Sequence, residues 1–266
     1  LGPGLVAVLA SRLPVKHFFS LDSASFLLSA AALLLIGRLR PLAARRNAHP
    51  PRNFLASAFH GFRVVAAHPV LRLNLQVTGA INGAWYAVIF LGLPLAIARH
   101  APGSSGLGAY GLIISSYGCT NLAATLVIGS RKMPGSPGRM IFAGHLVLGT
   151  GLMMMALAAS IPLPPAISIA SFALSAAIGA IGGPLHDIPI AVLRQTELPR
   201  ADVPASMRAH LVATHSGLLA AMLLVPPLYA VLPVPGVIAV CAVIIMAIGI
   251  AGMVRFSARS ILVNPF

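Results

Sequence analysis

Acidic residues are scarce in this sequence, whose 266 residues include four Asp and Glu against 18 Lys and Arg. Charged residues of both signs make up 8% of the chain, whereas a soluble domain has roughly 25%. A chain with so few charges cannot cover a water-facing surface, so the lipid bilayer is its expected solvent. The few acids are also too scattered to form a pair of catalytic carboxylates, so the sequence does not predict an enzyme.

Cysteine is equally scarce, and its placement excludes other classes of site. Cys119 and Cys241 both lie inside apolar runs, which is typical of free thiols and not of a disulfide or a metal pair. His145, His210 and His215 lie in or near apolar runs, and none of the three has metal-ligand spacing with another histidine, cysteine or acid. No Walker motif is present. No basic patch alternates with stacking aromatic residues. The sequence therefore predicts no metal, no bound cofactor and no nucleic-acid partner.

Long apolar runs make up most of the chain, since 58% of its residues are hydrophobic. A spanning helix needs about 20 apolar residues, and one such run covers residues 18–37. Six more runs follow, at residues 71–98, 106–129, 140–159, 166–193, 207–232 and 237–254. Within the run 166–193, Gly182-Gly183-Pro184 predicts a bend. The pattern predicts an all-α membrane protein with a six-helix bundle at residues 71–254.

The one long polar stretch, Arg38 to Arg72, holds seven arginines and no acid. We expect residues 38–70 to form a cytoplasmic loop that carries an amphipathic helix at 53–68, lying on the membrane surface. Asn53 is the expected N-cap, and His68-Pro69 is the expected end. The apolar face of this helix is predicted to contain Leu55, Phe59, Phe62 and Ala66.

Basic residues alternate from one predicted connection to the next. Fifteen of the 18 Lys and Arg fall in one set of alternate connections, which includes the stretch 38–72 and the tail 255–266. The other set holds only Arg12, Lys16 and Arg99. Because the connections rich in Lys and Arg stay in the cytoplasm, the pattern predicts a multi-pass protein with a cytoplasmic C-terminus.

Three motifs resemble those of a known transporter family. Gly2-Pro3 is similar to the Gly-Pro motif of the fifth helix in antiporters, and Asp22 to Phe26 resembles the start of a sixth helix. Leu193-Arg194-Gln195, followed by Pro199, resembles the connection between a tenth and an eleventh helix. Together these motifs resemble the bacterial drug- and siderophore-exporter branch of the major facilitator superfamily (MFS).

This resemblance implies a truncated MFS-type helical bundle, running from the end of the fifth helix through the twelfth. Residues 1–37 would be a remnant of the N-terminal bundle, with a partial helix at 1–10, and most of the first half would be missing. The implied function is proton-coupled efflux of a hydrophobic or amphipathic small molecule by alternating access. The expected location is the bacterial inner membrane, and the expected energy source is the proton gradient. The alternative is a transport-inactive scaffold or sensor derived from the same fold.

Two acids are candidates for proton coupling, because an ionisable group inside the membrane is costly to bury. Asp187 lies beside His186, about two turns inside the Arg194 end of its helix. It could bind a proton or contact substrate; alternatively, it pairs with an arginine of a neighbouring helix or already lies in the cytoplasmic mouth. Asp22 lies about one turn into its helix, where the helix dipole favours an acid. It is the second coupling candidate, with a purely structural role as the alternative.

A polar and aromatic face on one helix supplies the candidate substrate contacts. The residues of this face recur at helical spacing: Asn74, Thr78, Asn82, Trp85 and Tyr86. Such a face should point to protein or to a cavity rather than to lipid, so it predicts either interhelical hydrogen bonds or a substrate lining. His215 is a further cavity candidate, whereas the small-residue repeat of Gly79 and Gly83 predicts close helix packing.

Overall fold

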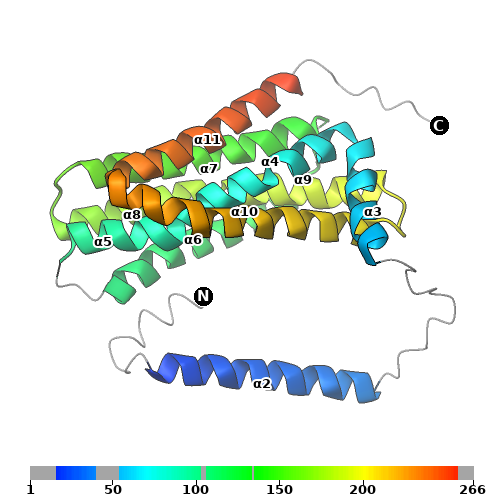
Figure 1. Cartoon of the computed structure of the whole chain (residues 1–266), viewed down its shortest axis with the longest axis horizontal. Coiled ribbons are helices and arrows are strands. Elements are labelled where there is room, and N and C mark those ends of the chain that lie inside the picture. Colours follow the sequence, from blue (N-terminus) through cyan, green and yellow to red (C-terminus); the bar gives the residue numbers. More distant parts are fainter. Residues whose placement is uncertain (1–15, 40–53, 103–105, 134, 257–266) are drawn as a thin grey trace.

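The structure is a computed structural model that describes residues 16–39, 54–102, 106–133 and 135–256. These residues form helices and connecting turns, without a strand among them (Figure 1). The helices in chain order are α2 (Lys16–Leu39), α3 (Phe54–Ala67), α4 (Pro69–Tyr86), the π-helix η1 (Ala87–Gly92), α5 (Leu93–His100), α6 (Gly106–Gly129), α7 (Pro137–Ser160), α8 (Pro165–Ala180), α9 (Gly182–Glu197), α10 (Val203–Val231) and α11 (Val234–Arg255). The all-α class predicted from the sequence is confirmed for this part of the chain.

Six helical segments within the described residues are long and apolar enough to cross a membrane. Four are single helices, namely α6, α7, α10 and α11, and two are composite, namely Pro69–His100 and Pro165–Glu197. Their order agrees with the six apolar runs read from the sequence, with ends that shift by a few residues. Six such helices indicate a multi-pass membrane protein.

The helix α2 lies apart from the other helices, most of which run side by side along the long axis (Figure 1). The side chains from Asp22 to Ile36 are all exposed. This apolar helix corresponds to the run predicted at residues 18–37. The predicted partial helix 1–10, the cap Asn53 and most of the tail 255–266 lie outside the described residues.

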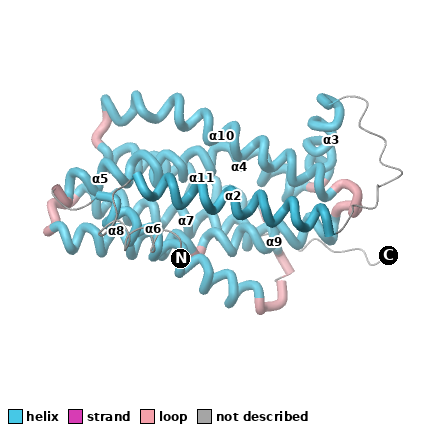
Figure 2. Tube along the Cα trace, turned by 90° about the horizontal axis from the view of Figure 1, so that it is seen from below, coloured by secondary structure: helices cyan, strands magenta, loops and turns pink. Residues whose placement is uncertain are grey.

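The helix α3 lies across one end of the bundle in both views (Figures 1 and 2). It packs on α10 through Gly61, because a Cβ at this position would overlap the backbone of Ala205. The neighbouring His60 also bonds α10, with its Nε2 2.8 Å from Asp202 Oδ1. Phe59, on a different face of α3, is 59% exposed. The helix ends at Ala67, where the sequence places its stop.

The first composite helix changes its hydrogen-bond pattern before Pro94. Proline has no backbone N–H, and its ring clashes with the carbonyl one turn earlier, so it disturbs the hydrogen bonding of the preceding α-helical turn. The chain adopts the π-helix η1 over Ala87–Gly92 instead. The Tyr229 hydroxyl of α10 donates a hydrogen bond to the Ala87 carbonyl at 3.1 Å. A kink of this type is frequent near functional sites.

The second composite helix breaks where the sequence predicts a bend. The helix α8 ends at Ala180, and α9 begins at Gly182 after Ile181. Glycine also lets α9 approach α7 closely, since a Cβ on Gly144 of α7 would lie 2.6 Å from the Gly182 carbonyl oxygen. The break therefore coincides with tight packing between α7 and α9.

Candidate functional site

A polar cavity of about 210 Å³ lies inside the helix bundle, beside the break between α8 and α9. Five helices contribute to its wall: α4, α6, α7, α9 and α10. The lining residues are Thr78, Ile81, Asn82, Trp85, Tyr117, His145, Leu148, Gly182, Gly183, His186, Asp187 and His210. Three histidines and a carboxylate thus share one cavity in a bundle of apolar helices, where ionisable groups are expensive and commonly functional.

A side chain of α6 contacts the backbone at the break between α8 and α9. The Asn121 side chain of α6 donates from Nδ2 to the Ala180 carbonyl at 3.2 Å, and so satisfies a group at the end of α8. A Cβ on Gly183 would lie 2.7 Å from this Asn121 nitrogen, so a larger residue at position 183 would displace the Asn121 side chain. The first turns of α9 then bring His186 and Asp187 to the cavity.

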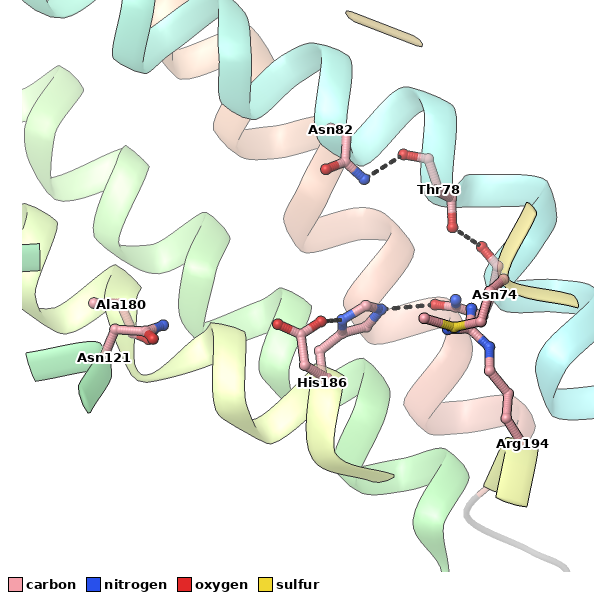
Figure 3. Close-up of polar contacts among 9 residues, drawn as sticks. Asn74, Thr78, Asn82, Asn121, Ala180, His186 and Arg194 are labelled. Carbon is pink, nitrogen blue, oxygen red and sulfur yellow. Dashed lines mark hydrogen bonds and ion pairs between the residues drawn. The ribbon is translucent and has the colours of Figure 1, made fainter. Parts of the chain in front are cut away.

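His186 is the centre of a hydrogen-bond chain between α9 and α4. Its Nδ1 lies 2.8 Å from Asp187 Oδ1, and its Nε2 lies 2.9 Å from Asn74 Oδ1 (Figure 3). Exposure falls steeply along this chain, since the side chain of Asp187 is 74% exposed and that of His186 is 15% exposed. Asn74 is 2% exposed. The chain therefore connects an accessible carboxylate to a buried amide through one imidazole.

Two side chains on the polar face of α4 donate hydrogen bonds to backbone carbonyls of the same helix. The Thr78 hydroxyl donates to the Asn74 carbonyl at 2.8 Å, and Asn82 Nδ2 donates to the Thr78 carbonyl at 2.9 Å (Figure 3). The sequence left two roles open for this face, interhelical hydrogen bonds and a cavity lining. Asn74 makes an interhelical hydrogen bond, whereas Thr78, Asn82 and Trp85 line the cavity.

Three polar atoms on the cavity wall are buried without a hydrogen-bond partner in the described structure. They are Trp85 Nε1, His145 Nε2 and His210 Nδ1. His145 is 4% exposed, and its ring centroid lies 4.4 Å from that of His186. Buried polar groups usually have partners, because leaving one unpaired costs about 1–3 kcal/mol. The wall can therefore offer hydrogen bonds to a polar group that enters the cavity.

An apolar cavity of about 460 Å³ shares Trp85 and Tyr117 with the polar one. The Trp85 and Tyr117 ring centroids are 6.2 Å apart, and Trp85 also makes an edge contact with Phe90. The other lining residues are Ile89, Leu107, Tyr110, Gly111 and Ile114. The two cavities together give one polar and one apolar chamber, which meet at a pair of aromatic rings.

Arg194 lies two turns beyond Asp187 on α9 and is 8% exposed. Its Nη1 donates to Met207 Sδ at 3.0 Å, and its side chain extends toward Asn74 (Figure 3). The Nε atom is buried without a partner in the described structure. Arg194 is therefore a buried cation near the only carboxylate on the cavity wall.

The remaining sequence candidates lie away from the polar cavity. Asp22 is exposed on α2, and His215 is exposed on α10, where its Nδ1 lies 2.8 Å from the Leu211 carbonyl of the same helix. Tyr86 stacks on Phe90 with a centroid distance of 4.5 Å and lines neither cavity. The sequence did not predict Tyr117 or Asn121 as site residues. Their spacing of four residues within an apolar helix is the pattern that could have indicated a polar face.

No protein-family model, no curated protein and no solved structure matches this chain. The described residues also bring together no set of three or more His, Cys, Asp or Glu that could hold a metal ion. The two cavities are therefore the features of the described structure that indicate a function.

Proposed function

We propose that this chain belongs to a secondary active transporter that couples proton movement to efflux of a hydrophobic or amphipathic small molecule. The observation that carries the proposal is the His186–Asp187 pair, which faces a cavity within a bundle of six apolar helices. A carboxylate and an imidazole can exchange a proton with water near neutral pH when their solvation changes. Such a change accompanies a cavity that opens alternately to the two sides of a membrane.

The paired chambers support the substrate class. Trp85 and Tyr117 stand between the polar cavity and the apolar one, so a single molecule can place a polar end beside Asp187 and an apolar end among aromatic rings. The combined space lies in the usual range for small-molecule sites, which is about 300–1,000 Å³. An amphipathic ligand fits this arrangement better than an ion or a sugar.

The interrupted helices support an alternating-access mechanism. The cavity lies between the composite helices Pro69–His100 and Pro165–Glu197, which carry the π-helix η1 and the break at Ile181. Transporters commonly place substrate sites beside such discontinuous helices. The resemblance of the sequence to the MFS adds the expected direction, which is export, and the bacterial inner membrane as the location.

The test is proton-coupled flux in proteoliposomes that contain the product of the complete gene. Lipophilic probes of both charges (tetraphenylphosphonium, ethidium and 1-anilinonaphthalene-8-sulfonate) are added, and internal pH is followed with trapped pyranine. We expect at least one probe to move with protons, and Asp187→Asn to abolish that flux. Glu197→Gln, at an exposed position of the same helix, should retain it.

Undiminished flux in Asp187→Asn would remove this residue from the coupling role. The alternative function is a transport-inactive scaffold or sensor, and the same vesicles distinguish it. In that case probes bind to the protein, but no probe moves protons across the membrane.

A further inference from the structure

Both ring nitrogens of His186 face oxygen atoms. Nδ1 lies 2.8 Å from Asp187 Oδ1, and Nε2 lies 2.9 Å from Asn74 Oδ1. A neutral imidazole has one N–H donor and one acceptor nitrogen, whereas an imidazolium has two donors. Since an ionised carboxylate and an amide oxygen only accept, an imidazolium at His186 can donate to both Asp187 and Asn74 in this arrangement.

Asn74 can also satisfy the neutral ring without any movement of the helices. An amide side chain carries an acceptor on one side and a donor on the other. When it turns over, Nδ2 replaces Oδ1 and donates to an unprotonated Nε2, while Nδ1–H of His186 still donates to Asp187. Asn74 is 2% exposed, so an unmatched group at this position would be costly. The contact between Asn74 and His186 can thus be made with His186 in either protonation state.

The surroundings restrict which group can hold the additional proton. The titratable and charged groups near His186 come from four helices: Tyr117 of α6, His145 of α7, Asp187 and Arg194 of α9, and His210 of α10. The α4 residues that face it, Asn74, Thr78 and Asn82, are uncharged. Among these groups, only His186 contacts the carboxylate through a hydrogen bond. A second imidazolium at His145, whose ring is 4.4 Å away, would repel the first.

We infer that His186, held between Asp187 and Asn74, is the residue that takes up and releases the coupling proton, with the Asn74 amide turning between the two states. That this proton is coupled to transport rests on the proposed function, whereas the choice of His186 rests on its hydrogen bonds. Uptake adds one proton from cavity water to Nε2 and converts imidazole to imidazolium. Release returns that proton to water and leaves the hydrogen on Nδ1. Asp187 then acts as a positioning residue that stabilises the imidazolium.

Nitrogen-15 NMR of histidine-labelled protein in lipid bilayers tests this inference directly. The chain has nine histidines, and the signal that disappears in His186→Gln is assigned to His186. Spectra recorded from about pH 8 to about pH 5 should show that signal in two forms, imidazole protonated at Nδ1 and imidazolium. His215→Gln, an exposed site on α10, is the control and should leave the signal unchanged.

Asn74→Asp gives the sharpest comparison, because it keeps the side-chain shape but cannot donate from an ionised carboxylate. At a fixed pH near 7, the ratio of imidazolium to imidazole at His186 should rise about tenfold or more. Asp187→Asn should change the ratio in the opposite direction. A His186 signal that stays in one form across this pH range, or a ratio unaffected by Asn74→Asp, would overturn the inference.

The experiment also separates this inference from the function that it serves. If the NMR result is as expected but no probe carries protons across vesicles, His186 exchanges a proton and the transport proposal fails. If transport is coupled while His186 keeps one protonation state, the coupling proton binds elsewhere. Circular dichroism of each variant shows whether the helices are retained, and the isosteric Asn74→Asp keeps the test informative when His186→Gln does not fold.

Discussion

Gly79 of α4 and Gly217 of α10 lie backbone against backbone, although 138 positions separate them in the chain. A Cβ on Gly217 would overlap the Gly79 carbonyl group, and a Cβ on Gly83 would lie 2.8 Å from the Gly217 carbonyl oxygen. The sequence predicted close packing for Gly79 and Gly83, and the structure confirms it. It also identifies Gly217 as the partner, which the spacing of glycines in α4 does not reveal.

Gly217→Ala should therefore destabilise the bundle, because overpacking a tight contact costs about 1–3 kcal/mol. Gly118→Ala is the matched control, since Gly118 lies within α6 and a Cβ there meets no atom within 4 Å. That control should be neutral or stabilising by up to about 1 kcal/mol. Thermal unfolding followed by circular dichroism in detergent measures both. Equal melting temperatures for the two variants would contradict the packing argument.

Acidification should weaken the cap between α3 and α4. His68 is the N-cap of α4, where its Nδ1 accepts a hydrogen bond from the Leu71 amide at 3.3 Å. Burial lowers the pKa of His68, and the Glu197 carboxylate opposes this effect more weakly. The unfolded chain therefore binds the proton at a higher pH than the folded protein. This contribution to stability is complete above the ordinary value of about 6.5, and it is lost progressively as the pH falls below that value.

His68→Asn tests the cap because asparagine also caps a helix but does not titrate in this range. The melting temperature of the parent protein should fall more steeply than that of His68→Asn between about pH 7 and pH 5. Hydrogen exchange at the Leu71 amide reports the cap itself. Parallel pH profiles for the two proteins would show that His68 does not contribute.

The Tyr229–Ala87 hydrogen bond should stabilise the π-helix η1. Tyr229→Phe removes only the hydroxyl group, which donates a hydrogen bond to the Ala87 carbonyl at 3.1 Å. The expected loss is about 1 kcal/mol. Tyr110→Phe is the control, because the Tyr110 hydroxyl makes no hydrogen bond within the described part of the chain and lines the apolar cavity. Thermal unfolding of both variants gives the comparison, and an equal effect would remove the hydrogen bond as the cause.

Trp85 should report ligand binding, because it is the only tryptophan in the sequence and stands where the two cavities meet. A bound aromatic probe should change its fluorescence in a saturable way. Tyr117→Ala should weaken the binding of tetraphenylphosphonium by about tenfold, since aromatic contacts of this kind contribute roughly 0.5–1.5 kcal/mol beyond buried area. Leu126→Ala, at a position of α6 that is 66% exposed, should leave it unchanged. A similar loss in both variants would mean binding outside this site.

Hydropathy and helix spacing determined the all-α class, the order of the six apolar helices and the break at Gly182. These features depend on local composition, because the cost of placing polar groups in lipid adds residue by residue along a segment. Local composition does not predict which residues contact His186. The sequence placed Asp187 and Asn74 among the candidates, but it did not pair them through His186.

Only the tertiary structure decided which polar residues meet. Asn74 and His186 are 112 positions apart, and their contact depends on how α4 and α9 are rotated about their own axes. That rotation is set by the packing of neighbouring helices, here through close glycine contacts, and not by the hydropathy of either helix alone. The same packing places Trp85 between two cavities and leaves His215 on the outer face of α10.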